Sequence, residues 1–182
     1  MKYVRCNACG FVTDEKAVHG KCPACGVNST AFEPYESRVS ERREGWLRLD
    51  VHPILVHFPQ AFIISLFLLL VSSRFFGEPV LGAVLACARV MIVVLPALVV
   101  LAIVSGLVDG KVRFRKVTTP ALTKKLFIGI ATAALSAAMV AVFLAQGFAA
   151  TPVLIGLSAG TVSCSVGLGL IGASLTCSKL PG

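Results

Sequence analysis

Four cysteines lie within the first 25 residues as two C-x-x-C pairs, Cys6 with Cys9 and Cys22 with Cys25, and twelve residues separate the pairs. Two such turns can converge on one ion and surround it with four thiolates in a tetrahedron. Iron and zinc both accept this ligand set, and the spacing does not separate them. The sequence therefore predicts a metal centre whose ligands are these four cysteines.

A second group of ionisable residues lies at the ends of long apolar segments. His52 and His57 open the first long apolar run, Asp109 follows the second, and Lys124 lies near the start of the third. Ionisable groups at membrane depth are costly, so a functional site is the default hypothesis. We expect the Asp109 carboxylate to pair with His57 and to fix the tautomer of its ring. His52, His57 and Asp109 are the candidate cofactor-binding residues.

Three uses of the membrane histidines remain open at this stage. A histidine can ligate the iron of haem b, it can hydrogen-bond a quinone and move its protons, or it can cap a helix and anchor it at the lipid headgroups. Because His52 and His57 are five residues apart, they differ by about 140° around a helix and cannot both ligate one haem. The remaining histidine, His19, lies between the cysteine pairs and is expected in a solvent-exposed loop.

Composition indicates the elements that position these residues. The chain has 182 residues, of which 56% are hydrophobic and only 14% are charged, which is too apolar for a soluble domain of this length. Four hydrophobic segments, at 53–75, 79–107, 121–147 and 151–176, are each long enough to cross about 30 Å of hydrocarbon. We therefore predict four transmembrane helices. The first apolar run starts well beyond the position of a signal peptide, and nothing before it looks cleavable.

Basic residues predict the orientation of these helices. They gather before the first segment and between the second and third, which the positive-inside rule assigns to the cytoplasm. Both termini are then cytoplasmic, in a reducing compartment where thiolates bind metal rather than form disulfides. The net charge of +8 follows from this placement and does not indicate nucleic acid. The residues concerned are Arg38, Arg42, Arg43 and Arg48, and then Lys111, Arg113, Arg115, Lys116, Lys124 and Lys125.

The N-terminal stretch resembles the rubredoxin-like domain that closes rubrerythrins, with C-x-x-C-G followed by an aromatic and then C-P-x-C-G. The resemblance covers about the first 35 residues and implies a small β module of the rubredoxin or zinc-ribbon type. We expect Gly10 and Gly26 to adopt positive φ, which turns backbone N–H groups toward the sulfurs. Tyr3, Phe11 and Phe32 are expected to form a minimal apolar core.

The membrane part resembles a prokaryotic family of four-helix membrane proteins whose members begin HPxxVHFP and end their second helix with Gly-Leu-x-Asp. Here the first motif starts at His52 and the second is found at Gly106–Asp109. The resemblance extends from residue 52 to about residue 175. The family often carries a further His and Asn at the start of the third helix, where this chain has Thr123, Lys124 and Lys125.

Together these observations predict a metal-binding domain at 1–36, a charged linker or interfacial segment at 37–51 and an all-α four-helix transmembrane domain at 52–182. The function expected is a membrane-anchored electron carrier rather than a catalyst. Its mononuclear iron centre would exchange electrons between a soluble redox protein and a quinone or haem in a prokaryotic cytoplasmic membrane. The alternatives are a zinc-ribbon membrane adaptor and an accessory subunit of a larger membrane oxidoreductase. Besides the lipid bilayer, the soluble redox protein and the quinone, a homo-oligomer or a larger membrane complex stays open as a partner.

Overall fold

The computed structural model describes residues 3–36, 40, 43, 45–46, 49, 51–114 and 119–176. The chain divides into an N-terminal unit and a helical unit, Trp46–Leu175. The first contains a small antiparallel sheet and the second four long helices, so the predicted fold class, a small β module plus a four-helix bundle, is confirmed. Most of the predicted linker at 37–51 lies outside the described residues.

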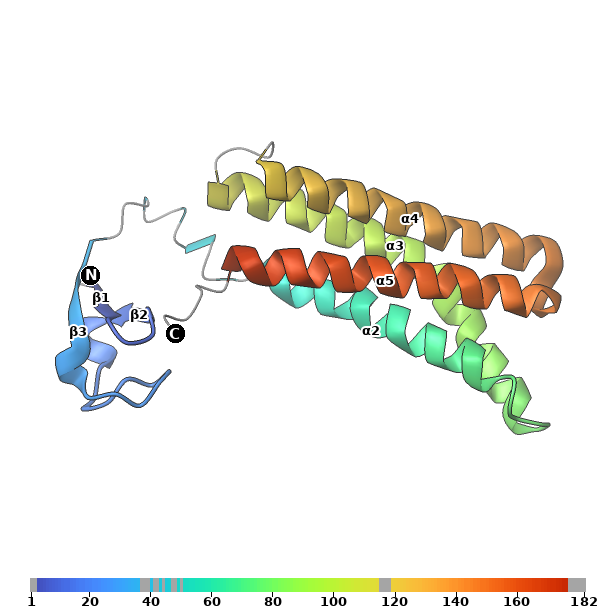
Figure 1. Ribbon diagram of the computed structural model, residues 1–182, viewed down its shortest axis with the longest axis horizontal. Helices are drawn as coiled ribbons and strands as arrows, with labels where there is room; N and C mark the ends of the chain where they lie inside the picture. The colour runs from blue at the N-terminus through green and yellow to red at the C-terminus, as the bar shows by residue number, and fades with distance from the viewer. Residues whose placement is uncertain are drawn as a thin grey trace. The chain divides into compact units, whose positions relative to one another are not determined.

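The β module is a three-stranded sheet with strand order β2-β1-β3 (Figure 1). Strand β1 (Tyr3–Cys6) pairs antiparallel with β2 (Val12–Asp14) on one side and with β3 (Phe32–Tyr35) on the other. Two short 3-10 helices, η1 (Glu15–Ala17) and η2 (Ser29–Ala31), complete it. Each begins at a side-chain oxygen that accepts a backbone N–H, at Asp14 and Asn28, because short polar side chains favour such turns.

The interior of this module is made by cysteines. Among its described residues only Cys6 and Cys22 are buried. Of the three aromatic residues expected to form a core, Tyr3 and Phe32 are half-buried and Phe11 is exposed. A module with so little buried hydrocarbon depends on another source of stability, and a bound metal is a common one at this size.

The helical unit consists of α2 (Val51–Ser72), α3 (Val80–Phe114), α4 (Pro120–Gln146) and α5 (Thr151–Thr176), with a 3-10 turn η3 (Gly147–Ala150) before the last helix. The four helices run alongside one another (Figure 1). All four are long and apolar enough to cross a membrane. Helix α3 continues seven residues beyond the predicted span, which ended at 107. This extension carries the charged residues Asp109, Lys111 and Arg113, and the Arg113 guanidinium lies 3.3 Å from the Asp109 carboxylate four residues earlier.

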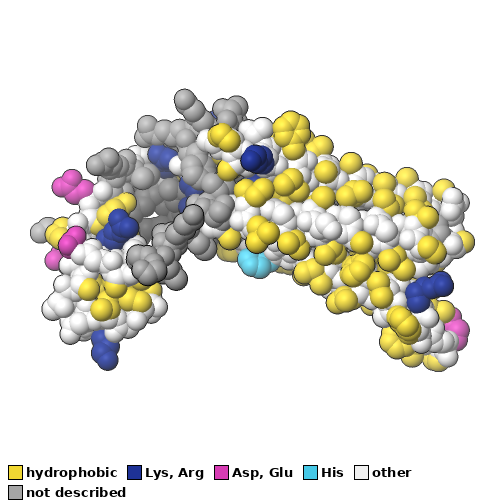
Figure 2. All heavy atoms as spheres, in the orientation of Figure 1, with side chains coloured by type: hydrophobic (Ala, Val, Ile, Leu, Met, Phe, Trp, Pro, Cys, Tyr) yellow, Lys and Arg dark blue, Asp and Glu magenta, His cyan; other side chains and the backbone are white. Residues whose placement is uncertain are grey.

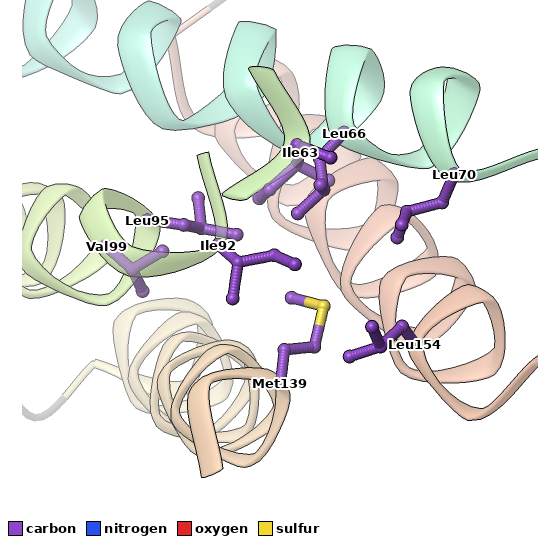
Figure 3. Packing of buried hydrophobic residues seen from close by; sticks show 9 residues of the cluster. Ile63, Leu66, Leu70, Ile92, Leu95, Val99, Met139 and Leu154 are labelled. Atoms are coloured by element: carbon purple, nitrogen blue, oxygen red, sulfur yellow. The ribbon is translucent and has the colours of Figure 1, made fainter. Parts of the chain in front are cut away.

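Buried side chains recur along each helix at alternating spacings of three and four residues. On α2 they are Pro59, Ile63, Leu66 and Leu70, and the same spacing joins Ile92, Leu95 and Val99 on α3. All of these side chains except that of Pro59 meet Met139 of α4 and Leu154 of α5 in one cluster (Figure 3). A repeat of this kind keeps one stripe of each helix turned toward its neighbours.

The outside of the bundle is also apolar. In Figure 2 hydrophobic side chains are spread along the length of the bundle face in view, and Ile64, Leu68 and Leu170 are each more than half exposed. In water such a surface would be an extensive exposed patch, whereas in lipid it requires no partner. The surface thus agrees with the length and composition of the helices in indicating a bilayer environment.

Small hydroxyl side chains fill part of the bundle interior. Thr132 and Ser136 of α4 and Ser158 and Thr161 of α5 are buried, and each hydroxyl donates to a carbonyl oxygen three or four residues earlier in its own helix. No buried side-chain nitrogen or oxygen among the described residues lacks a partner. Small residues that satisfy their own hydrogen bonds let helices approach closely in lipid.

Candidate metal centre and polar cluster

The four cysteine sulfurs form a compact cluster. All four Sγ atoms lie within 4.8 Å of one another, Cys6 Sγ is 3.9 Å from Cys25 Sγ, and Cys9 Sγ is 3.8 Å from Cys22 Sγ. A metal about 2.3 Å from each sulfur of a tetrahedron separates the sulfurs by about 3.8 Å. The distances are far longer than a disulfide bond of about 2.05 Å. The cluster can hold a metal ion, which all four predicted ligands would contact.

The two C-x-x-C turns have the same backbone structure. In each, the first cysteine's carbonyl accepts a hydrogen bond from the glycine four residues later, with N···O distances of 2.8 Å for Gly10 and 2.8 Å for Gly26. The two glycines have φ of +77° and +76°, as expected. Residues other than Gly and Asn rarely adopt this left-handed conformation. The turns therefore present two thiols each from one compact loop.

The pKa values of two cysteines show how charge is distributed over the cluster. Burial raises the pKa of Cys22, but backbone hydrogen bonds from Cys25 and Ala24 and bonds from neighbouring thiols outweigh it and lower the pKa to about 7. At Cys9 the backbone N–H of Phe11 lowers the pKa, whereas burial and the other three thiols raise it to about 12. Four thiolates this close together need a cation between them, because each new negative charge opposes the next.

Solvent reaches only one member of each pair. Cys6 and Cys22 are buried, Cys9 is half-buried and Cys25 is exposed. The second cysteine of each C-x-x-C turn therefore lies toward the surface of the module. The two buried cysteines would shield an ion at the centre from solvent. On the other side only the Cys9 and Cys25 side chains would separate the ion from solvent.

The helical unit contains a second group of polar side chains, centred on His52. The His52 Nδ1 atom lies 2.9 Å from Ser105 Oγ of α3. The ring also packs against Gly106, where an added Cβ would stand 2.9 Å from His52 Cε1. The absence of a side chain at Gly106 therefore makes room for the imidazole, and the two sequence motifs of the membrane part meet in this contact.

Charged side chains from later turns of α3 and from α4 lie near enough to His52 to act on it electrostatically. Lys125 of α4, Asp109 and Arg113 all act electrostatically on His52, and Asp109 also acts on Lys125. Lys125 is half-buried, and its Nζ atom would lie 3.6 Å from a Cβ at Gly172 of α5. We call His52, Ser105, Asp109, Arg113 and Lys125 the polar cluster. It is formed by three helices and abuts the fourth.

The structure brings together two of the three predicted cofactor-binding residues, His52 and Asp109. His57 is exposed, and its Nδ1 atom lies 2.5 Å from the Pro53 carbonyl oxygen of its own helix. The Asp109 carboxylate pairs instead with Arg113. The expected pairing of His57 with Asp109 is therefore not the one found, and Lys125 rather than the exposed Lys124 joins the cluster.

The spacing of buried residues would have distinguished the two histidines. His52 lies seven residues before the buried Pro59, in the same heptad position, whereas His57 lies seven residues before Ile64, which is 52% exposed. Lys125 likewise lies seven residues before the buried Thr132. Extending a buried heptad stripe to the end of each helix would have selected His52 and Lys125.

Comparisons with family models, with curated proteins and with solved structures give no match for this chain. The structure itself shows two features: a four-thiol site that can hold a metal ion, and four helices that are long and apolar enough to span a membrane.

Gly106→Ala is expected to destabilise the helical unit by about 1–3 kcal/mol, because the new methyl group overlaps the His52 ring. Gly156→Ala is the matched control, since a Cβ at that position of α5 meets nothing within 4 Å. There the better helix propensity of alanine should be neutral or stabilising. Unfolding midpoints in mixed micelles measure both. Equal midpoints for the two variants would contradict the packing of His52 on Gly106.

Proposed function

We propose that this chain is a membrane-anchored electron-transfer protein with a mononuclear iron centre of the rubredoxin type. Iron bound by Cys6, Cys9, Cys22 and Cys25 would cycle between ferric and ferrous states with no open coordination position, which suits a carrier rather than a catalyst. The membrane part, which resembles the HPxxVHFP family, would hold this centre at a bilayer surface.

The observation that carries the proposal is the unequal exposure of the four sulfurs. Two ligands are buried, which protects the ion, and two lie toward the surface, where a partner protein can approach within a short distance of the metal. Backbone hydrogen bonds to Cys9 and Cys22 are the contacts through which a protein tunes the potential of a thiolate-bound metal. Both features suit electron exchange with a soluble redox protein.

The membrane acceptor or donor in this scheme is a quinone or a haem b. The polar cluster supports such a site, because ionisable groups that converge from three helices are costly in lipid unless they serve a function. We place the protein in a prokaryotic cytoplasmic membrane with both termini in the cytoplasm. Four spans return the chain to its starting side, and Lys111, Arg113 and Lys124 flank the connection between α3 and α4 on that side.

One observation favours a second candidate, a zinc-ribbon membrane adaptor. Paired C-x-x-C-G turns with sulfur separations near 3.8 Å suit zinc as well as iron. In that case the module would recognise a protein partner, and the helices would anchor the module to the membrane. Such an adaptor would act alone, as a homo-oligomer or as an accessory subunit of a larger membrane oxidoreductase.

The visible spectrum of the protein purified in mild detergent, with metal analysis of the same sample, tests the two candidates. We expect one iron per chain and ferric–thiolate absorption that bleaches with dithionite. An additional Soret band would identify haem in the bundle. A colourless protein with one zinc per chain would exclude the electron-transfer function and support the adaptor.

A further inference from the structure

The hydrogen bonds around Ser105 determine the tautomer of His52. Ser105 Oγ lies 2.9 Å from the Ala102 carbonyl oxygen, to which it donates its only hydrogen. Its oxygen can therefore only accept from His52 Nδ1, at 2.9 Å. The neutral imidazole is consequently protonated at Nδ1, and Nε2 carries a lone pair. This arrangement orients the ring and leaves one nitrogen available as a hydrogen-bond acceptor.

The lone pair on His52 Nε2 limits which ligands can bind there. At Nε2 itself, neutral His52 offers no donor to a phosphate or carboxylate, so this atom favours a ligand that donates a hydrogen bond. Haem iron could use the lone pair, but the backbone at Gly106 lies beside the ring, with an added Cβ 3.3 Å from Nε2. This close packing leaves less room for a large porphyrin than for a small ring. A hydroxyl group on a small flat ring is a hydrogen-bond donor and suits both conditions better.

We propose that His52 Nε2 accepts a hydrogen bond from the hydroxyl group of a membrane hydroquinone, with Ser105 as the positioning residue that fixes the tautomer. This inference deepens the proposed function, since it names the membrane partner of the iron centre. His52 is one residue from the start of α2, at one end of a helix that is long and apolar enough to cross a membrane. The apolar outer faces of the helices would accommodate its isoprenoid tail.

The inference is tested on the full-length protein in nanodiscs with histidine-selective ¹⁵N labelling and decylubiquinol as the probe. The chain has only three histidines, so His52→Gln assigns the His52 resonances. We expect the Nδ1–H tautomer at His52, and a shift of its Nε2 resonance when decylubiquinol is added. A His52 ring protonated at Nε2, or a His52 Nε2 resonance that does not shift when the hydroquinone is added, would overturn the inference.

Variants of Ser105 separate positioning from simple packing. Ser105→Ala should mix the two tautomers and raise the Kd for decylubiquinol at least tenfold, and Ser105→Thr, which keeps the hydroxyl, should restore both. Ser163→Ala removes a hydroxyl that bonds only within its own helix on an exposed face, and His57→Gln removes the exposed histidine; neither should change the Kd. If wild type and Ser105→Ala have the same Kd, the His52–Ser105 hydrogen bond only holds α2 against α3, and the inference is overturned.

The binding measurement does not depend on the metal. If the protein carries zinc but binds decylubiquinol through His52, the iron-based function fails and the hydroquinone site stands. If the iron centre is redox-active but the hydroquinone does not bind at His52, the electron-transfer function stands and this inference fails.

Discussion

Replacing Cys22 by serine should abolish stoichiometric metal binding and unfold the N-terminal module. Cys22 is one of the two buried residues in the described part of this module, and its sulfur lies 3.8 Å from that of Cys9. Structural zinc in zinc-finger peptides binds with on the order of 10–16 kcal/mol, and in such small domains this binding free energy drives folding. Metal analysis and amide exchange over residues 3–36 measure the two effects.

The matched control is Cys87→Ser, which changes an exposed thiol of α3 that is not part of the cluster. It should retain one metal per chain and full amide protection in the module. Retention of one tightly bound metal by Cys22→Ser would contradict the four-thiolate site. Cys25→Ser is expected to have a smaller effect on folding than Cys22→Ser, because its side chain is exposed and contributes less to the interior of the module.

The module shows where sequence reasoning is sufficient. The spacing of the cysteine pairs identifies the four sulfurs that converge, because a C-x-x-C turn is a local structure. The positive φ of Gly10 and Gly26 follows from the same local geometry. The aromatic core was not predicted correctly: burial of Phe11 depends on how the sheet closes over the cysteines, which is a tertiary property, and Phe11 is instead 36% exposed.

In the helical unit the sequence predicts how many helices there are but not which way each one faces. Hydropathy identifies four spans, and each corresponds to one helix. Helix α3, however, is apolar on all sides, with Val90, Val93 and Val100 exposed and Ile92 and Val99 buried. In lipid both faces are hydrophobic, so the pattern that reveals orientation in a soluble protein is missing.

The choice between His57 and His52 illustrates the consequence. The sequence led us to expect His57 as the partner of Asp109, but the five-residue separation turns the two rings to different faces of α2. The contact with Ser105 and Gly106 shows directly that His52 faces the neighbouring helix. It also gives a physical reason for the glycine of the Gly-Leu-x-Asp motif, since a larger residue would displace the ring.

Leu66→Ala should lower the free energy of unfolding of the helical unit by about 2 kcal/mol or more. Leu68→Ala on the same helix should lower it by only a small fraction of that amount. Leu66 is fully buried in the cluster that joins four helices, and Leu68 is 58% exposed. Truncation at a buried site leaves a cavity that rigid neighbours do not fill. Lipid chains, by contrast, fill the space left at an exposed site. Unfolding midpoints of both variants in mixed micelles provide the measurement.

The comparison also tests what holds the bundle together. In lipid, separated helices remain in an apolar medium, so the hydrophobic transfer of leucine contributes little and the cost of Leu66→Ala comes mainly from lost van der Waals contacts. If the two variants lose the same stability, close packing between helices is not the source of it. The polar cluster would then be the principal link between the helices, and Ser105→Ala would have the larger effect.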